Sequence, residues 1–151
     1  MNSKLRQTEH ENGLILFRQG HYIQALSIFK SAVSNYGPHI GLLSDISACY
    51  SLIDDIEGLN ESTDFLQSEF KLAQRKLSPV NIARTHLFLS KIYEDQAKVS
   101  LSLQELDLAS KINNLPAELK IKIRCNQLRL LSFLKINENL EYYYHLCLQF
   151  D

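Results

Sequence analysis

Residues 18–32 read Arg-Gln-Gly-His-Tyr-Ile-Gln-Ala-Leu-Ser-Ile-Phe-Lys-Ser-Ala, and this stretch decides the fold. Gly20 lies between two predicted helices, at about 5–17 and 22–35, where glycine is favoured because the chain turns through a left-handed conformation. Apolar and small residues of the second helix recur at steps of three and four and so share one face. That face consists of Tyr22, Ala25, Leu26, Phe29, Ala32 and Val33. The stretch therefore predicts two antiparallel helices that small residues allow to pack closely.

The same alternation of small and bulky residues returns 77 positions later. Small residues correspond to small ones, and bulky to bulky, in four aligned pairs: Gly13 and Ser90, Ala25 and Ser102, Phe29 and Leu106, Ala32 and Ala109. The helix that begins this second copy has an apolar face formed by Ile82, His86, Leu89 and Tyr93. Two copies in register predict a chain built from helical repeats.

Prolines divide the chain into blocks, each about as long as two helices and their turns. Pro38, Pro79 and Pro116 are separated by 41 and 37 residues, and proline is tolerated at the start of a helix but not inside one. We therefore predict a single all-α domain, 1–151, of eight helices in four hairpins. The expected hairpins are about 3–37, 38–78, 79–115 and 116–151. Turns are expected near Gly20, Gly37-Pro38, Asp54, Pro79, Ala97, Pro116 and Ile136.

The second and fourth blocks match the pattern less well. At an offset of 34 residues, Ser47 aligns with Gly13 and is suitably small. Leu59, Thr63 and Leu66 align with Ala25, Phe29 and Ala32, and their residue types do not fit the pattern. The surplus length of this block is expected in an extended helix from Ile56 to about Leu77. The fourth block is expected to form two helices, at about 117–135 and 138–150, in a register that the pattern leaves open.

The chain resembles the tetratricopeptide repeat (TPR) family, whose unit is a 34-residue helix-turn-helix. The residues that carry the likeness are Gly13, Gly20-His21-Tyr22, Ala25, Phe29, Ala32 and Pro38. We count two good repeats and two degenerate ones. The resemblance implies a right-handed superhelix of antiparallel helix pairs, a TPR-like α-solenoid. Its concave side would be lined by the first helix of each unit and would hold a peptide or a partner helix.

Composition and charge fit one ordinary folded domain. The chain has 151 residues, of which 45% are hydrophobic and 22% charged, and its formal net charge is −1. Such a balance does not favour nucleic acid or a membrane surface as the partner. The sequence has no apolar stretch near the roughly 20 residues that span a bilayer, and no leader pattern. We therefore expect a cytoplasmic protein.

Motifs for catalysis are missing from the sequence. It contains no glycine-rich phosphate loop, no GxSxG, no HExxH and no paired Cys/His spacing. Its histidines are scattered, and Cys49 and Cys125 sit among apolar residues, as buried thiols do. We therefore predict that the protein is not an enzyme and uses no cofactor and no metal.

The resemblance to TPR proteins also implies which residues line a partner-binding groove. They would be His10, Leu14, Phe17, Arg18, Ser44, Ala48, Ser51, Arg84, Lys91 and Glu94. This set combines an apolar floor with a basic wall and suits an apolar segment that carries an acid. Leu14 and Phe17 have an alternative interpretation, as residues that pack between units.

The expected function is protein–protein interaction, as a scaffold or as the repeat domain of a larger signalling or regulatory protein. One alternative is a chaperone of the type III secretion class that holds an extended client segment. A second alternative is a domain that senses a peptide or a small ligand. All three would use the same groove, so the sequence leaves the choice open.

The C-terminal segment carries more apolar residues than one packed helix face needs. Its candidate interface consists of Tyr142, Leu146, Leu148 and Phe150. A repeat array normally ends on a polar outer face, so we expect a cover for this end. That cover would be a homodimer mate bound through the C-terminal hairpin, or residues that follow Asp151.

Overall fold

The computed structural model of the chain describes residues 2–148, apart from the side chains at positions 140, 143, 144, 146 and 147. Its α-helices are α1 (Asn2–Arg18), α2 (Tyr22–Tyr36), α3 (Ile40–Leu52), α4 (Ile56–Ala73), α5 (Pro79–Asp95), α6 (Val99–Ser110) and α7 (Ala117–Leu148), and a short 3-10 helix η1 (Gln74–Lys76) follows α4. No residue within 2–148 lies in a strand, which confirms the predicted all-α class. None of the helices in this range is both long enough and apolar enough to cross a lipid bilayer.

Three hairpins, α1/α2, α3/α4 and α5/α6, precede α7, and their turns are alike. Each turn contains one residue with a positive φ: Gly20 at 84°, Asp54 at 58° and Ala97 at 60°. In each case the next amide donates to the carbonyl five residues earlier, at 2.9, 3.1 and 2.8 Å. This bond defines the Schellman motif, which ends a helix through a left-handed residue. The three turns stand at the offsets of 34 and 77 that relate the repeats in the sequence.

Within each hairpin, the helices meet at short side chains. Gly13 of α1 lies against the ring of Phe29, which is fully buried. At the aligned place in the third hairpin, the Ser102 hydroxyl donates to the Ser90 carbonyl at 2.8 Å. The Ser90 hydroxyl therefore donates to Ser102 Oγ, also at 2.8 Å. Because both hydroxyls are hydrogen-bonded, Ser90 can be buried at the position where the first hairpin has Gly13.

All positions aligned by the two offsets are buried, including those of the second hairpin, whose residue types depart from the pattern. They are Gly13, Ala25, Phe29 and Ala32; Ser47, Leu59, Thr63 and Leu66; Ser90, Ser102, Leu106 and Ala109. Leu59, Thr63 and Leu66 are therefore buried, although their residue types depart from the repeat pattern. The departure is visible at Thr63, whose buried hydroxyl has no hydrogen-bond partner among the described residues.

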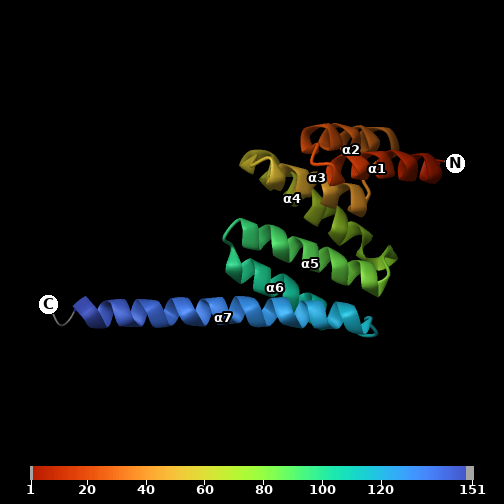
Figure 1. Cartoon of the computed structure of the whole chain (residues 1–151). Coiled ribbons are helices and arrows are strands. Elements are labelled where there is room, and N and C mark those ends of the chain that lie inside the picture. The colour runs from red at the N-terminus through yellow and green to blue at the C-terminus, as the bar shows by residue number, and fades with distance from the viewer. Residues whose placement is uncertain (1, 149–151) are drawn as a thin grey trace.

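Two hydrophobic clusters connect the hairpins, and α5 belongs to both. The first extends through the first five helices, and its fully buried large side chains include Phe29, Leu42, Leu66 and Leu89. The second joins α5, α6 and α7 through Ala83, Ala109, Leu115, Leu119 and Ile123. Figure 1 shows the helices following one another in chain order, with α1 and α2 at one end and α7 at the other.

Helix α4 is the longest of the three second helices, as the surplus of the second block predicts. It begins after Asp55, whose carboxylate accepts a bond from the Gly58 amide at 2.9 Å. It ends at Ala73, four residues earlier than expected, and η1 covers part of the difference. Helix α5 begins at Pro79 with Ser78 as its N-cap, so the predicted break at this proline is confirmed.

The predicted turn near Ile136 is wrong. Residues 117–148 form one continuous helix of 32 residues, so there are no separate helices at 117–135 and 138–150 and the fourth hairpin does not form. The sequence around Ile136 contains neither proline nor glycine, and adding a residue to an existing helix is easier than starting a new one. Asparagines 137 and 139 only lower the helix propensity slightly.

Exchanging glycine and alanine at equivalent turns should change stability in opposite directions. Ala97 has φ 60°, and an L residue in this conformation costs about 1–2 kcal/mol. This cost exceeds the roughly 0.4–1 kcal/mol that alanine gains by restricting the unfolded chain. We expect Ala97→Gly to raise the free energy of unfolding by about 0.5 kcal/mol and Gly20→Ala to lower it by about as much. Urea denaturation measures both, and changes of the same sign would contradict the equivalence of the turns.

Enlarging a small residue inside a hairpin should destabilise the fold. Ala25 and Ala109 are both 0% exposed, so Ala25→Leu or Ala109→Leu should lower the free energy of unfolding by about 1–3 kcal/mol through overpacking. The same change at the exposed Ala117 serves as the matched control and should stay within about 0.5 kcal/mol. If Ala25→Leu left stability unchanged, the helices would not be in close contact there.

Candidate functional site

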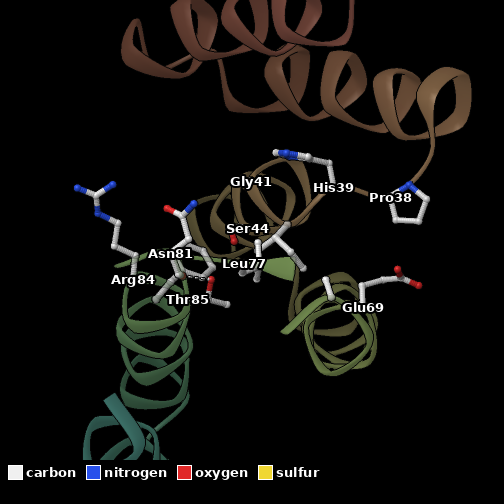
Figure 2. A pocket seen from close by; sticks show the side chains of 12 residues that line it. Pro38, His39, Gly41, Ser44, Glu69, Leu77, Asn81, Arg84 and Thr85 are labelled. Atoms are coloured by element: carbon white, nitrogen blue, oxygen red, sulfur yellow. Dashed lines mark hydrogen bonds between the residues drawn. The ribbon is translucent and has the colours of Figure 1, made fainter. Parts of the chain in front are cut away.

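A first cavity of about 450 Å³ lies where α3 meets the end of α4 and the start of α5. Ser44 lines it from α3, Glu69 from α4, and Asn81, Arg84 and Thr85 from α5. Figure 2 shows the Arg84 and Glu69 side chains extending from opposite sides of this cavity. The Thr85 hydroxyl donates to the Asn81 carbonyl at 2.8 Å within α5. Arg84 is the arginine or lysine among the residues that line this cavity.

A second cavity of about 650 Å³ lies between α5 and the first part of α7. It shares Arg84 and Phe88 with the first cavity, so the two adjoin along α5. We call this combined surface the α5 groove. From α7 it includes Leu119, Lys122 and Asn126.

The α5 groove is lined by three cations and, besides Glu94, by two acids, Glu69 and Glu118. Arg84, Lys91 and Lys122 are exposed. Glu94 also lines the second cavity, but its carboxylate is engaged, because Arg129 donates to both of its oxygens at 2.5 and 2.8 Å. This hydrogen bonding lowers the pKa of Glu94 and raises that of Arg129. Glu94 therefore stays ionised near neutral pH, with its charge balanced by Arg129.

The remaining lining of the α5 groove is mostly neutral. Burial lowers the pKa of His39, and the nearby Arg6 and His10 lower it further, so the ring is uncharged at neutral pH. Leu77 and Phe88 are half-buried and supply apolar surface. The groove thus has an apolar floor with basic side chains along it, while Glu69 and Glu118 add acidic groups.

The structure brings together four of the residues predicted for the groove. Ser44, Arg84, Lys91 and Glu94 all line the α5 groove. Ser51 lines a separate cavity beside the turns of the second and third hairpins. Ala48 is half-buried and lines neither cavity of the α5 groove.

The residues predicted from α1 do not line the α5 groove. His10 Nε2 lies 2.5 Å from Asp45 Oδ2 of α3, and its ring meets the Phe29 ring edge-on. Leu14 and Phe17 pack against the first hydrophobic cluster, as their alternative interpretation holds. Arg18 is exposed at the last residue of α1. These side chains mainly connect helices.

The groove residues that sequence reasoning missed include those of α7 as well as Glu69, Asn81 and Phe88. Lys122 and Asn126 lie one helical turn apart on α7, and Leu119 precedes them by three residues. This spacing of three and four is visible in the sequence, but only the packing of α7 against α5 and α6 decides which face looks into the groove. Phe88 lies four residues after Arg84 and could have been found by extending the face of α5.

The predicted C-terminal interface lies partly outside the described residues. Tyr142 and Leu148 are 62% and 54% exposed on α7. Phe150 and the side chain of Leu146 lie outside what the structure describes. The hairpin expected to carry this interface is replaced by the single helix α7.

Of the two thiols expected to be buried, Cys49 is buried, whereas Cys125 is exposed on α7, so that expectation is wrong for Cys125. No group of three His, Cys, Asp or Glu residues within 2–148 could hold a metal ion. Burial raises the pKa of the Cys49 thiol to about 12, so it holds no thiolate at neutral pH. His86 Nδ1 lies 2.6 Å from Glu105 Oε2, and the Phe70 ring packs edge-on against His86. This pair joins α5 to α6.

Comparison with known proteins adds no assignment to this geometry. No protein-family model matches the chain, and no curated protein matches its sequence. The α5 groove and its charges are therefore the features that bear on function.

Proposed function

We propose that the chain is a protein-interaction module that binds a peptide or a partner helix in the α5 groove. The observation that carries this proposal is the continuity of the two cavities along α5, where an apolar floor adjoins three exposed cations. A concave surface with a mostly apolar lining and a few fixed polar groups is the common form of a binding site.

We further propose that the chain is a degenerate TPR array, whose hairpins stack into a right-handed superhelix. Three observations support this idea: the offsets of 34 and 77, the equivalent Schellman turns at Gly20, Asp54 and Ala97, and the burial of all aligned positions. In such an array, α3, α5 and the start of α7 would line the concave side. Helix α7 would then act as the final, unpaired helix of the array.

The charge of the α5 groove favours a partner of stated chemistry. Arg84, Lys91 and Lys122 lie on both walls of the second cavity, and Arg129 already neutralises Glu94, so the cations outnumber the one other acid of this cavity, Glu118. An extended segment with apolar residues and one or more carboxylates would meet both requirements, because cations facing an acidic ligand raise its association rate and set its orientation. The secretion-chaperone and ligand-sensing alternatives stay predictions, since both would use the same groove.

Charge reversal in the groove should weaken binding of such a segment. The probe is a displayed library of random peptides, from which binders to the intact chain are selected and resynthesised with a fluorescent label. We expect these peptides to be rich in apolar and acidic residues. Arg84→Glu combined with Lys122→Glu should weaken their binding about tenfold or more, because attraction is replaced by repulsion. Fluorescence anisotropy measures the affinity.

Lys120→Glu is the matched control for Lys122→Glu. Lys120 is also exposed and lies on α7, but it lines a different cavity, away from α5. It should change the affinity by no more than about twofold. If Lys122→Glu weakened peptide binding no more than Lys120→Glu does, the α5 groove would not be the binding site. Selected peptides that were mostly basic would lead to the same conclusion.

A further inference from the structure

A further cavity, of about 690 Å³, lies between α4 and α6 with α5 as its floor. We call it the α4/α6 cleft. Its floor residue His86 follows Arg84 of the α5 groove by two positions, which is about 200° around the helix, so the cleft and the groove lie on opposite sides of α5. The second and third hairpins touch mainly through α3 and α5, and the cleft stays open between α4 and α6. Its volume lies within the range of about 300–1,000 Å³ that is typical of ligand pockets.

The floor of the α4/α6 cleft contains a buried histidine with one free ring nitrogen. His86 is only 6% exposed, and its Nδ1 lies 2.6 Å from Glu105 Oε2. Because a carboxylate can only accept, Nδ1 carries a proton, and in the neutral ring Nε2 presents a lone pair. Nε2 makes no hydrogen bond within residues 2–148 and retains access to solvent. Since His86 lines the cleft, this lone pair is available to a ligand there.

Two carboxylates from different helices converge on this side of α5. Glu105 on α6 and Asp64 on α4 both line the cleft. Burial raises the pKa of Tyr93 on α5, and the negative charges of Glu105 and Asp64 raise it further. One hydroxyl senses both charges, so the two carboxylates gather at the same part of the cleft. Within the described residues, neither the Asp64 carboxylate nor Glu105 Oε1 makes a hydrogen bond.

One end of the α4/α6 cleft is therefore acidic. Lys71 is the arginine or lysine among the residues that line the cleft. It follows Asp64 by seven residues on α4, which is about 10 Å along the helix, and within the described chain it pairs with neither acid. Apolar surface adjoins the acidic end and comes from three side chains of the floor and rim: Phe70, Leu89 and Leu108.

The acceptors of the cleft suit an organic cation better than a metal ion. His86, Glu105 and Asp64 do not form a group that could hold a metal ion, and neither does any other such set within residues 2–148. A guanidinium group carries five N–H donors in a rigid plane, so it can bond to several dispersed acceptors at once. The ammonium group of lysine is a compact point charge without this reach. The chemistry of the cleft therefore favours arginine.

We propose that the α4/α6 cleft binds an arginine side chain that a partner protein presents beside apolar residues. The guanidinium group lies between the carboxylates of Glu105 and Asp64 and donates to Nε2 of His86. The apolar residues of the partner cover Phe70 and Leu108, which a free small cation would leave exposed. This site has the opposite charge preference to the α5 groove and lies on the other side of α5, so it stands apart from the proposed function.

Binding of a defined peptide tests the site. The probe is the tripeptide leucine-arginine-leucine with both ends blocked, titrated into the isotope-labelled full chain and followed by amide chemical shifts. We expect a dissociation constant of about 1 mM or lower, with the largest shifts at residues 64–71, 86–89 and 105–108. No binding, or shifts confined to other parts of the chain, would overturn the proposal.

Two altered probes separate charge, shape and apolar contact. The same peptide with citrulline in place of arginine keeps the shape but loses the charge, and it should bind at least about tenfold more weakly, because charge-assisted hydrogen bonds are the stronger ones. Free arginine amide should also bind more weakly than the tripeptide, since it lacks the leucines that cover apolar surface. Equal affinity for citrulline would contradict recognition of a cation, and equal affinity for free arginine would contradict a partner segment.

Acid-to-amide exchanges test the two carboxylates. Glu105→Gln should raise the dissociation constant of the tripeptide at least about tenfold, because it removes a charge and disturbs the bond that orients His86. Asp64→Asn should raise it about threefold. Asp64 is exposed, so this variant keeps the fold, and circular dichroism checks both.

Glu61→Gln and Asp107→Asn are the matched controls. Glu61 is exposed on α4 and Asp107 on α6, and neither lines the α4/α6 cleft. Each should change the dissociation constant by no more than about twofold. Effects as large as those of Asp64→Asn and Glu105→Gln would mean that overall charge, and not the cleft, attracts the peptide.

A last variant distinguishes this site from the α5 groove. The chain with Arg84→Glu and Lys122→Glu should bind the tripeptide within about twofold of the unaltered chain, because both side chains line the groove and not the cleft. A failure of the α5 groove as a binding site therefore leaves this result unchanged. A large change in tripeptide affinity in this variant would place the arginine in the α5 groove and overturn the proposal.

Discussion

The close approach of two antiparallel helices at Gly13 and its aligned positions is the constraint on which the other contacts depend. A side chain at Gly13 would enter the space of the Phe29 ring, which is fully buried and held by its neighbours. The third hairpin meets the same constraint with Ser90 and Ser102: the Ser102 hydroxyl donates to the Ser90 carbonyl, and the Ser90 hydroxyl donates to Ser102 Oγ. Because helix separation is set inside each hairpin, the outer faces of α3 and α5 are available to pack on the next unit.

Helix α5 connects the hydrophobic clusters to the α5 groove. Ala83 and Leu89 on α5 are buried in different hydrophobic clusters, so the helix is held from two sides. Arg84 and Lys91 occupy the remaining face, where they line the groove. The bidentate pair between Glu94 and Arg129 fixes α7 against the end of α5 and so sets the second wall. The positions of the side chains that line the α5 groove are therefore a consequence of the core, not of flexible loops.

The hairpins could be predicted from sequence because the signals that specify them are local. Gly20 and the small residues that follow it can be recognised within one repeat. The offset of 77 residues then locates the turn at Ala97, where the sequence has no glycine to mark a turn. The prediction of a break at Ile136 was wrong, because a helix that continues has no sequence signal other than the absence of proline and glycine. The groove was harder to predict. An apolar residue such as Phe17 follows the same pattern whether it faces a partner or its own core, and only the packing of the helices distinguishes the two.

The length of α7 also determines how the molecule moves in water. A helix of 32 residues is about 48 Å long, whereas a compact chain of 151 residues has a radius of gyration of only about 15 Å. The rod of α7 therefore makes a single chain an elongated particle, with more hydrodynamic friction than a sphere of its mass. Elution volume and sedimentation rate consequently report the shape of this protein as much as its mass.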